Sequence, residues 1–347
     1  MILTVEDITD RTGSEESTMP AIDVVVPCYR YAHFLRDCVE SVLSQNVDGI
    51  RVLVIDDASP DDTPEVAAEL MASDSRVSFI RHPVNLRHIA TYNEGLEWAS
   101  AKYMLLLSAD DYLPPQALAR AIDVMERHPD IGFTFGNAIE LCDGDTKAAV
   151  DARALAAPVG PSSVMSGVAY IESNRCRNVV ATPTAVVRTS VQKLVGPYRP
   201  SLPHSGDMEM WLRFAAIASV GYIDAYQAVY RKHAANMSRA YYASSSLPDV
   251  QQRRAAIDSF FDTCNLLLPD RAGLRSRMYE ALSREAVSFA SAAFNENELG
   301  VAGQLRAFAL TLDPKVARSW PWFKFSLKRA LGLGRWRSLQ SMRSMWQ

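Results

Sequence analysis

The sequence predicts an α/β protein with a mostly parallel, doubly wound sheet and a C-terminal helical extension. Two observations predict this fold class. In the first two thirds of the chain, short aliphatic and β-branched runs alternate with segments whose apolar residues recur at helical spacing. That order is typical of strands joined by crossover helices. From about residue 249 onwards, the pattern is helical only.

Short aliphatic runs bounded by proline or turn residues predict strands at residues 22–26, 51–55, 77–80, 103–107, 131–135 and 138–141. The amphipathic segments between them predict helices at residues 34–43, 65–72, 90–100 and 116–127. Residues 143–164 are rich in alanine and interrupted by proline and glycine, which predicts a long loop.

Further along the chain we expect a short strand at residues 184–188, a helix at 207–219 and closing strands near 222–223 and 228–230. Helices are then expected near 250–268, 272–294 and 299–312. The chain therefore divides into a flexible leader at 1–20, an α/β domain at 21–240, a helical region at 241–314 and a basic aromatic tail at 315–347.

Composition favours an ordinary globular enzyme. With 48% hydrophobic and 22% charged residues, the 347-residue chain has enough apolar residues for a sizeable core. Its five cysteines are scattered without a paired motif, which argues against a disulfide framework or a zinc site and favours a reducing compartment. The leader lacks the basic-then-apolar order of a secretion signal, and no apolar run approaches the ~20 residues of a membrane span. We therefore expect a cytoplasmic protein.

Two adjacent carboxylates, Asp110 and Asp111, follow the predicted strand at 103–107, whose residues suit a fully buried strand, and precede Pro114 and Pro115. Because like charges repel, such a pair is stable only where a cation, a basic side chain or water offsets its negative charge. A divalent metal ion that carries a diphosphate would offset it. The alternative is that one Asp caps the following helix while the other is solvated. The pair by itself does not decide between these interpretations.

A second strand ends on Asp56 and Asp57. In a parallel sheet the carboxyl ends of both strands lie at the same edge, where open α/β sheets bind ligands. We therefore expect four carboxylates along one crevice.

A series of short motifs runs through the α/β part of the chain. In order, these are Val-Val-Val-Pro-Cys-Tyr at 24–29, residues 35–45, Ile-Asp-Asp-Ala-Ser at 55–59, Asn-Glu-Gly at 93–95, Ala-Asp-Asp at 109–111, Gly-Asp at 206–207 and Trp-Leu-Arg at 211–213. The series resembles the family 2 glycosyltransferases of the GT-A fold, and the resemblance covers about residues 21–238.

The resemblance implies an inverting transferase that uses a nucleotide-diphosphate sugar, with a UDP-sugar favoured. It places Pro27 and Tyr29 beside the nucleotide, lets Asp57 bind the base, and makes Asp207 the catalytic base. Asp110 would contact the ribose-diphosphate, and Asp110 and Asp111 would bind Mn²⁺ or Mg²⁺, the ions that oxygen-rich sites prefer.

The chain also departs from the family pattern. Ser108 stands where many relatives have a further Asp, and Tyr92 occupies the position of a usual Arg. Arg87 or His88 is expected to supply the missing phosphate contact. His233, in a segment that resembles the family's His-x-x-Asn-x-Ser, is expected at the metal or the diphosphate.

Each of these residues also has a plain structural interpretation. Asp207 could simply cap its helix, with Glu209 as the reserve catalytic candidate, and His233 could be a structural histidine. His204 is a weaker candidate for acceptor contact. Trp211 and Phe214 are expected in the core.

The tail from residue 315 onwards contains eight Lys or Arg and no acidic residue, whereas the rest of the chain has a net charge of −12. Aromatic residues interleaved with these cations suit a helix at an anionic lipid surface and a lipid-linked acceptor. A solvated tail is the alternative, and the acidic body argues against nucleic acid.

We therefore expect a metal-dependent glycosyltransferase of a bacterial surface polysaccharide pathway, acting on a saccharide or a lipid-linked saccharide at the inner face of the membrane. One alternative is an inactive nucleotide-sugar-binding or membrane-docked scaffold, which Ser108 and Tyr92 make conceivable. A Rossmann-type dehydrogenase is disfavoured because no Gly-x-Gly-x-x-Gly follows the first strand.

Overall fold

A computed structural model describes residues 21–236, 246–263 and 268–336. One eight-stranded sheet runs through the α/β part, in the order β3-β2-β1-β4-β7-β5-β8-β6. Its strands are β1 (Ile22–Cys28), β2 (Ile50–Asp56), β3 (Val77–Arg81), β4 (Tyr103–Leu106), β5 (Ile131–Cys142), β6 (Ser163–Met165), β7 (Val186–Arg188) and β8 (Ser219–Lys232).

The first four strands are parallel and form one half of the sheet. β7 is antiparallel to both of its neighbours, β5 and β8 are parallel, and β6 closes the edge antiparallel to β8. The predicted fold class, a mostly parallel doubly wound sheet followed by helices, is confirmed.

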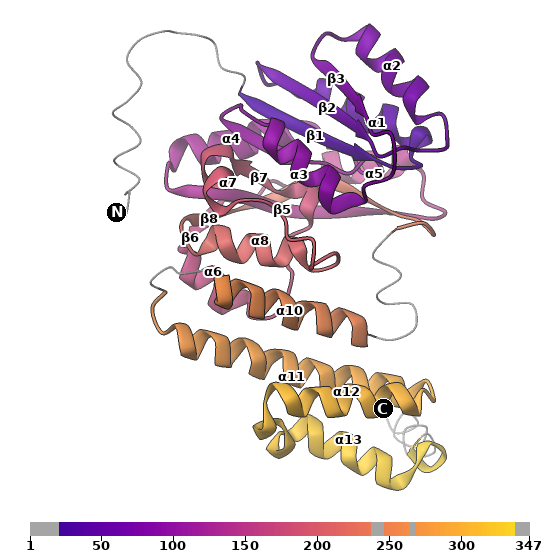
Figure 1. Ribbon diagram of the computed structural model, residues 1–347, viewed down its shortest axis with the longest axis vertical. Helices are drawn as coiled ribbons and strands as arrows, with labels where there is room; N and C mark the ends of the chain where they lie inside the picture. Colours follow the sequence, from indigo (N-terminus) through magenta and orange to yellow (C-terminus); the bar gives the residue numbers. More distant parts are fainter. Residues whose placement is uncertain (1–20, 237–245, 264–267, 337–347) are drawn as a thin grey trace.

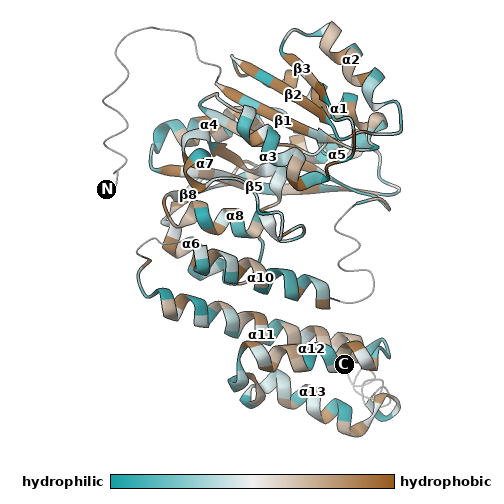
Figure 2. Cartoon of the chain, viewed as in Figure 1, coloured by the Kyte–Doolittle hydropathy of each residue, from teal (hydrophilic) through white to brown (hydrophobic). Residues whose placement is uncertain are grey.

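Helices cover both faces of the sheet. One face carries α1 (Ala32–Leu43), α2 (Thr63–Ser73) and α4 (Ala117–Arg127), and the core there includes Ile22, Val24 and Val26. The other face carries α3 (His88–Trp98), α6 (Gly167–Asn174), α8 (Gly206–Ala215) and α10 (Leu247–Thr263), with Val25 in its core. β1 is buried at every position, so alternate side chains enter opposite cores. Figure 2 shows the hydrophobic character of the central strands.

The helical layers continue away from the sheet (Figure 1). Below α10 lies α11 (Arg271–Asn295), which packs against α12 (Leu299–Leu312) and α13 (Trp320–Leu331). The turn η3 (Pro314–Arg318) connects the last two. Phe325 of α13 is fully buried and contacts the ring of Phe294. Residues 315–336 of the predicted tail are therefore helical and pack against α11. Residues 337–347 and the predicted leader at 1–20 lie outside the described residues.

Several predicted elements differ from the structure. The long loop predicted at 143–164 is wrong, because this segment contains α5 (Lys147–Ala156) and β6. Thr146 caps α5 by accepting from the N–H of Ala149, so the alanine-rich run forms a helix. α7 (Thr189–Val195) and α6 were not predicted.

Two short strands were expected within residues 131–141 and two more within 222–230. Each pair is one long strand in the structure, β5 and β8 respectively. Their mutual register shifts around Gly136 and Asn137. A β-bulge of this kind bends a strand without ending it, which makes one strand look like two in the residue pattern.

Candidate active site

A cleft of about 1270 Å³ opens at the carboxyl ends of β1, β2 and β4. The start of α3, β5, the segments 178–183 and 198–204, the start of α8, the end of β8 and the residues after it also line the cleft. Seven of the eight residues predicted for the site line this cleft: Pro27, Tyr29, Asp57, Arg87, Asp110, Asp111 and Asp207. The eighth, His233, contacts Asp110. The structure thus brings together residues from six separate parts of the sequence.

Asp110 and Asp111 follow β4 and are both buried. Oδ1 of Asp111 accepts a hydrogen bond from the backbone N–H of Arg231. Burial, and then the charge of Asp110, raise the pKa of Asp111 well above its ordinary value. The interpretation of this pair as a helix cap is wrong, because α4 begins at Ala117 and its capping residue is Gln116.

The chain beyond β8 closes over the acid pair. Nε2 of His233 lies 3.1 Å from Oδ2 of Asp110, and Nδ2 of Asn236 lies 3.3 Å from the same oxygen. Nδ2 of Asn236 also donates to the carbonyl of Arg231, which holds this turn together. Ser238, the last residue of the motif that predicted His233, lies outside the described residues.

The two carboxylates and the imidazole suit a divalent cation only if other ligands take part. No cluster of three or more His, Cys, Asp or Glu with metal-binding geometry occurs in the described part of the chain. However, burial and the charge of Asp110 raise the pKa of Asp111 although Arg231 acts against this, so further positive charge would favour the ionised pair. A cation with phosphate and water oxygens as further ligands would supply that charge, so the residues present fit Mn²⁺ or Mg²⁺.

Asp57 lies on the opposite wall of the cleft, at the end of β2. Its Oδ1 accepts from the backbone N–H of Leu86 at 2.7 Å and lies 2.8 Å from Nδ1 of His82. The backbone carbonyl of Asp57 accepts from the side chain of Asn85. His82 was not predicted, because a histidine after a strand has no motif that would distinguish it. Only the packing of the 82–86 segment beside β2 brings it to Asp57.

Asp207 is the second residue of α8, inside the helix that Ser205 caps, so the hypothesis that it is only a helix cap is wrong. Its Oδ2 accepts from Nδ2 of Asn178 at 2.8 Å and from Oγ1 of Thr182 at 3.2 Å. Burial raises the pKa of Asp207, although these donors favour its charged form. Asn178 and Thr182 were missed, since they lie in an irregular segment with no local pattern.

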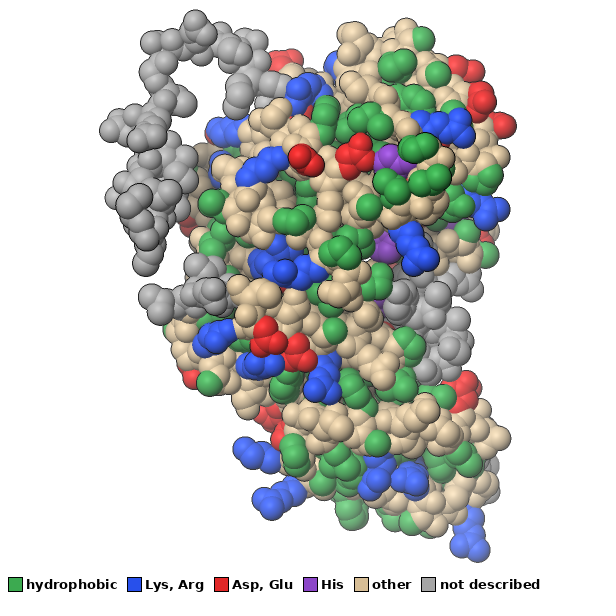
Figure 3. Space-filling model, in the orientation of Figure 1, with side chains coloured by type: hydrophobic (Ala, Val, Ile, Leu, Met, Phe, Trp, Pro, Cys, Tyr) green, Lys and Arg blue, Asp and Glu red, His purple; other side chains and the backbone are tan. Residues whose placement is uncertain are grey.

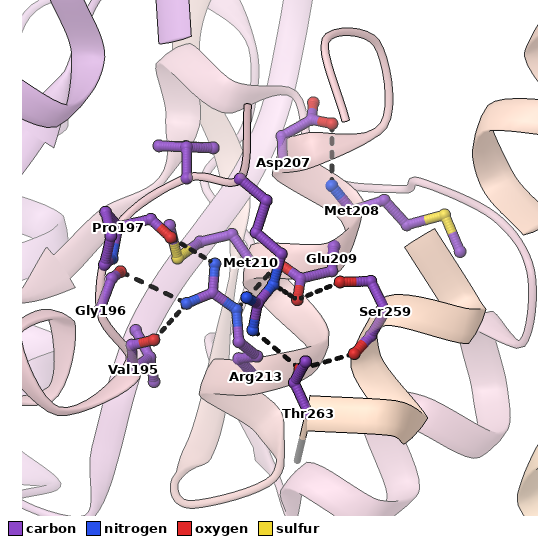
Figure 4. Close-up of polar contacts among 12 residues, drawn as sticks. Val195, Gly196, Pro197, Asp207, Met208, Glu209, Met210, Arg213, Ser259 and Thr263 are labelled. Atoms are coloured by element: carbon purple, nitrogen blue, oxygen red, sulfur yellow. Dashed lines mark hydrogen bonds and ion pairs between the residues drawn. The ribbon is translucent and has the colours of Figure 1, made fainter. Parts of the chain in front are cut away.

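Glu209, the reserve catalytic candidate, is fully buried and does not line the cleft. It accepts from Nε of Arg199 and Nε of Arg213, both at 2.8 Å, and Ser259 of α10 also donates to it (Figure 4). Figure 4 shows this carboxylate directed away from that of Asp207. Glu209 is therefore a structural residue that fastens α8 to α10.

His88 and His204 also line the cleft. Nε2 of His88 donates to the carbonyl of Pro203 at 2.9 Å, and burial lowers the pKa of His88. Nε2 of His204 lies 3.0 Å from Oδ1 of Asp249 on α10. Because His88 already donates to the backbone, Arg87, whose side chain is exposed at the cleft, is the better cation for a phosphate.

The aromatic residues of α8 are core residues, as predicted. Trp211 is 3% exposed and stacks on Phe133 of β5 with ring centroids 5.0 Å apart, and Phe214 is fully buried. Arg213 anchors the helix, donating to Glu209 and to the backbone carbonyls of Val195 and Pro197.

Comparison with known proteins identifies the domain that carries this cleft. Residues 23–152 match the model described as glycosyl transferase family 2. This part of the chain is therefore similar to that family. An uncharacterized glycosyltransferase of Haemophilus influenzae is 30% identical over 125 residues, which are 36% of this chain and 49% of the relative. The match thus spans about half the length of that curated relative.

Solved structures share the fold. Residues 1–349 of S. aureus TarS, in complex with UDP-GlcNAc, superpose with a TM-score of 0.62 at 16% identity, covering 94% of this chain and 92% of the TarS 1–349 chain. The mannosyltransferase PcManGT of Pyrobaculum calidifontis, in complex with GDP-Man and Mn²⁺, gives a TM-score of 0.55 at 15% identity, covering 90% and 84%. The fold of this chain is therefore the GT-A fold of these structures.

Proposed function

We propose that this protein is an inverting glycosyltransferase that moves one sugar from a nucleotide-diphosphate donor to a saccharide or lipid-linked saccharide. The observation that carries the proposal is the meeting of Asp57, Asp110, Asp111 and Asp207 around one cleft. A bacterial surface polysaccharide pathway is the proposed setting.

The donor side of the cleft is the wall with Pro27, Tyr29 and Asp57. Oδ1 of Asp57 is already occupied by the N–H of Leu86 and by His82, so the carboxylate is held in place before a nucleotide arrives. Arg87 faces the diphosphate. A divalent cation at Asp110, Asp111 and His233 would supply positive charge for the departing phosphates.

Asp207 acts as the general base in this mechanism. The acceptor hydroxyl oxygen forms a bond to the anomeric carbon while the bond from that carbon to the β-phosphate oxygen breaks. The electron pair leaves with the nucleoside diphosphate, and the hydroxyl proton moves to Asp207. Asn178 and Thr182 both donate to Oδ2 of Asp207 and the backbone N–H of Met208 donates to Oδ1, so the carboxylate is oriented and the second lone pair of Oδ1 is left for the acceptor.

A UDP-sugar is the favoured donor, because TarS was solved with UDP-GlcNAc. PcManGT was solved with GDP-Man and Mn²⁺, which makes GDP-sugars the matched comparison. A thermal-shift panel of UDP-, GDP- and dTDP-sugars, each with and without Mn²⁺, tests the proposal, because selective binding raises the melting temperature. One nucleotide class should stabilise the protein, more strongly with Mn²⁺. No shift with any member of the panel would contradict the assignment.

The alternative, an inactive sugar-nucleotide-binding scaffold, predicts binding without turnover. Release of nucleoside diphosphate in the presence of an acceptor extract separates the two, since a scaffold releases none.

We also propose that the C-terminal helices dock on an anionic membrane from the cytoplasmic side. On α13, the exposed residues Trp320 (71%), Phe323 (56%) and Leu327 (45%) recur at helical spacing along one face. Residues 315–336 include six Lys or Arg and no acid. Figure 3 shows hydrophobic and basic side chains gathered over this end of the molecule. No described helix is long and apolar enough to cross a bilayer.

Co-sedimentation with phosphatidylcholine vesicles, with and without phosphatidylglycerol, tests this docking. Binding should require the anionic lipid and weaken with salt. The double variant Trp320→Ser/Phe323→Ser should lose binding by about tenfold or more. Leu194→Ser, on the equally exposed face of α7, is the matched control and should bind as the wild type does. Equal binding to neutral vesicles would contradict the proposal.

A further inference from the structure

His82 lies between the carboxylates of Asp57, which lines the cleft, and Glu94. The residue follows β3 directly and its side chain is only 5% exposed. Its Nδ1 lies 2.8 Å from Oδ1 of Asp57, and its Nε2 lies 2.6 Å from Oε2 of Glu94 on α3. Each ring nitrogen therefore faces a carboxylate oxygen, and the imidazole bridges β2 to α3.

This arrangement determines the protonation of the ring. A carboxylate can only accept hydrogen bonds, and a neutral imidazole has a single N–H to donate. A neutral His82 ring would therefore place the lone pair of its other nitrogen against a carboxylate oxygen. An imidazolium donates to both. Burial by itself lowers the pKa of His82, but the hydrogen bonds to Asp57 and then to Glu94 outweigh it, and the pKa is raised.

Other charges nearby are already paired. The carbonyl of Asp56 accepts from the backbone N–H of His82, and the Asp56 carboxylate pairs with Nε of Arg81 at 3.2 Å. Asp57, which follows β2, and Glu94 of α3 are the charged groups that raise the pKa of the His82 ring.

Through Asp57, His82 also helps to hold residues 85–87, which lie beside Asp57 at the cleft. Oδ1 of Asp57 is shared between His82 and the N–H of Leu86, and Asn85 donates to the carbonyl of Asp57. Arg87 follows immediately, and its backbone has a positive φ of 68°. A non-glycine residue in that conformation has to be held by its surroundings. Loss of one His82 hydrogen bond would loosen both Asp57 and the segment that presents Arg87.

We propose that His82 is a positioning residue that, as an imidazolium, clamps Asp57 to Glu94 and makes donor binding weaken as the ring loses its proton. The proposal rests on the proposed function for the role of Asp57, but the state of the ring is independent of it. In this mechanism the catalytic base is unaffected, so the donor KM changes with pH while kcat follows Asp207.

The ring is observed directly by ¹⁵N NMR of the full chain labelled at histidine, with His82→Gln used to assign the signal. Both ring nitrogens of His82 should have protonated shifts at about pH 7, above the ordinary histidine pKa of ~6.5. Glu94→Gln removes one of the two acceptor charges, so His82 should lose its proton at lower pH. An unprotonated ring nitrogen in the wild type at that pH would overturn the proposal.

Donor affinity is then measured across pH by titration with the nucleotide that the thermal-shift panel selects. Wild-type affinity should fall by about tenfold as His82 titrates, the scale of one lost charge-assisted hydrogen bond. Glu94→Gln should show the same fall at lower pH, and His82→Gln should bind weakly at all pH values. Glu97→Gln, on the same helix, is the matched control and should follow the wild type.

A flat affinity profile in the wild type, with the ring shown to titrate, would also overturn the proposal. If no nucleotide binds at all but both nitrogens of His82 are protonated, the proposed function fails while the clamp itself stands.

Discussion

Nε2 of His233 lies 3.1 Å from Oδ2 of Asp110, although 123 residues separate them in the chain. The contact joins the segment after β8 to the acid pair after β4. A ring nitrogen at this position either ligates a cation held by Asp110 or orients that carboxylate.

The contact predicts that His233→Ala weakens metal use. The Mn²⁺ concentration needed for half-maximal transfer should rise by about 10- to 100-fold, the usual effect of losing a metal ligand's partner. Activity titrated against Mn²⁺ after chelator treatment measures this. His128→Ala, at the end of α4, is the control. A lower kcat with an unchanged Mn²⁺ requirement would argue against a role for His233 at the metal.

Asp207→Asn should reduce kcat by about 10² to 10⁴ while donor affinity stays unchanged, because the amide cannot take up the acceptor proton. Single-turnover transfer and nucleotide titration measure the two quantities. A variant that retains near wild-type transfer would exclude Asp207 as the base.

The same substitution should not lower stability. Burial raises the pKa of Asp207, so the folded protein holds this proton more tightly than the unfolded chain does. Stability therefore falls as pH rises from the ordinary Asp pKa, about 3.9, through the raised value. Asp207→Asn should remove that fall, and denaturant unfolding at several pH values measures it. A large loss of stability in Asp207→Asn would indicate a structural role instead.

The acid limb of kcat/KM should lie above the ordinary Asp pKa, because Asp207 must be deprotonated to act and burial raises its pKa. Asn178→Ala removes a donor that favours the charged carboxylate, so this limb should move to higher pH. The pH dependence of kcat/KM for both proteins tests the shift. A limb that moves to lower pH, or stays in place, would contradict the assigned contact.

Glu209→Gln should destabilise the fold by about 3–5 kcal/mol, since it leaves Arg213 buried without its counter-charge. Denaturant unfolding measures the loss. Glu280→Gln, which removes an exposed ion pair with Arg284 on α11, should change stability by less than about 1 kcal/mol. If Glu209→Gln kept full stability and lost transfer, Glu209 would have to be reconsidered as a catalytic group.

Gly95→Ala tests how closely α3 approaches the sheet. A Cβ at this position would lie 2.2 Å from Cγ1 of Val25 on β1, so the substitution should cost about 1–3 kcal/mol. Gly300→Ala, in α12 with open space around it, should instead stabilise by about 0.5–1 kcal/mol. Thermal unfolding compares the two, and Val25→Ala should partly rescue Gly95→Ala.

Much of the donor side of the cleft could be predicted from short patterns of neighbouring residues. Asp57 and Asp110 each follow an aliphatic run, and parallel strands bring their carboxyl ends to one edge, so their proximity follows from the order of elements. The long loop predicted at 143–164 failed for a local reason as well. Alanine is a strong helix former and Thr146 caps the run, so α5 forms despite the proline and glycine that follow it.

The sequence by itself determined the α/β class, the edge of the sheet that carries the acids and the resemblance to family 2 glycosyltransferases. These features depend on residues that are close together in the chain, because such residues set the periodicity of an element and the point where a strand ends. Only the tertiary structure decided that Asn178 and Thr182 hold Asp207, that Glu209 belongs to an ion-pair network, and that His82 bridges Asp57 and Glu94. Those contacts join residues on separate elements, and which side chains meet there depends on how the elements pack and on no pattern along the chain.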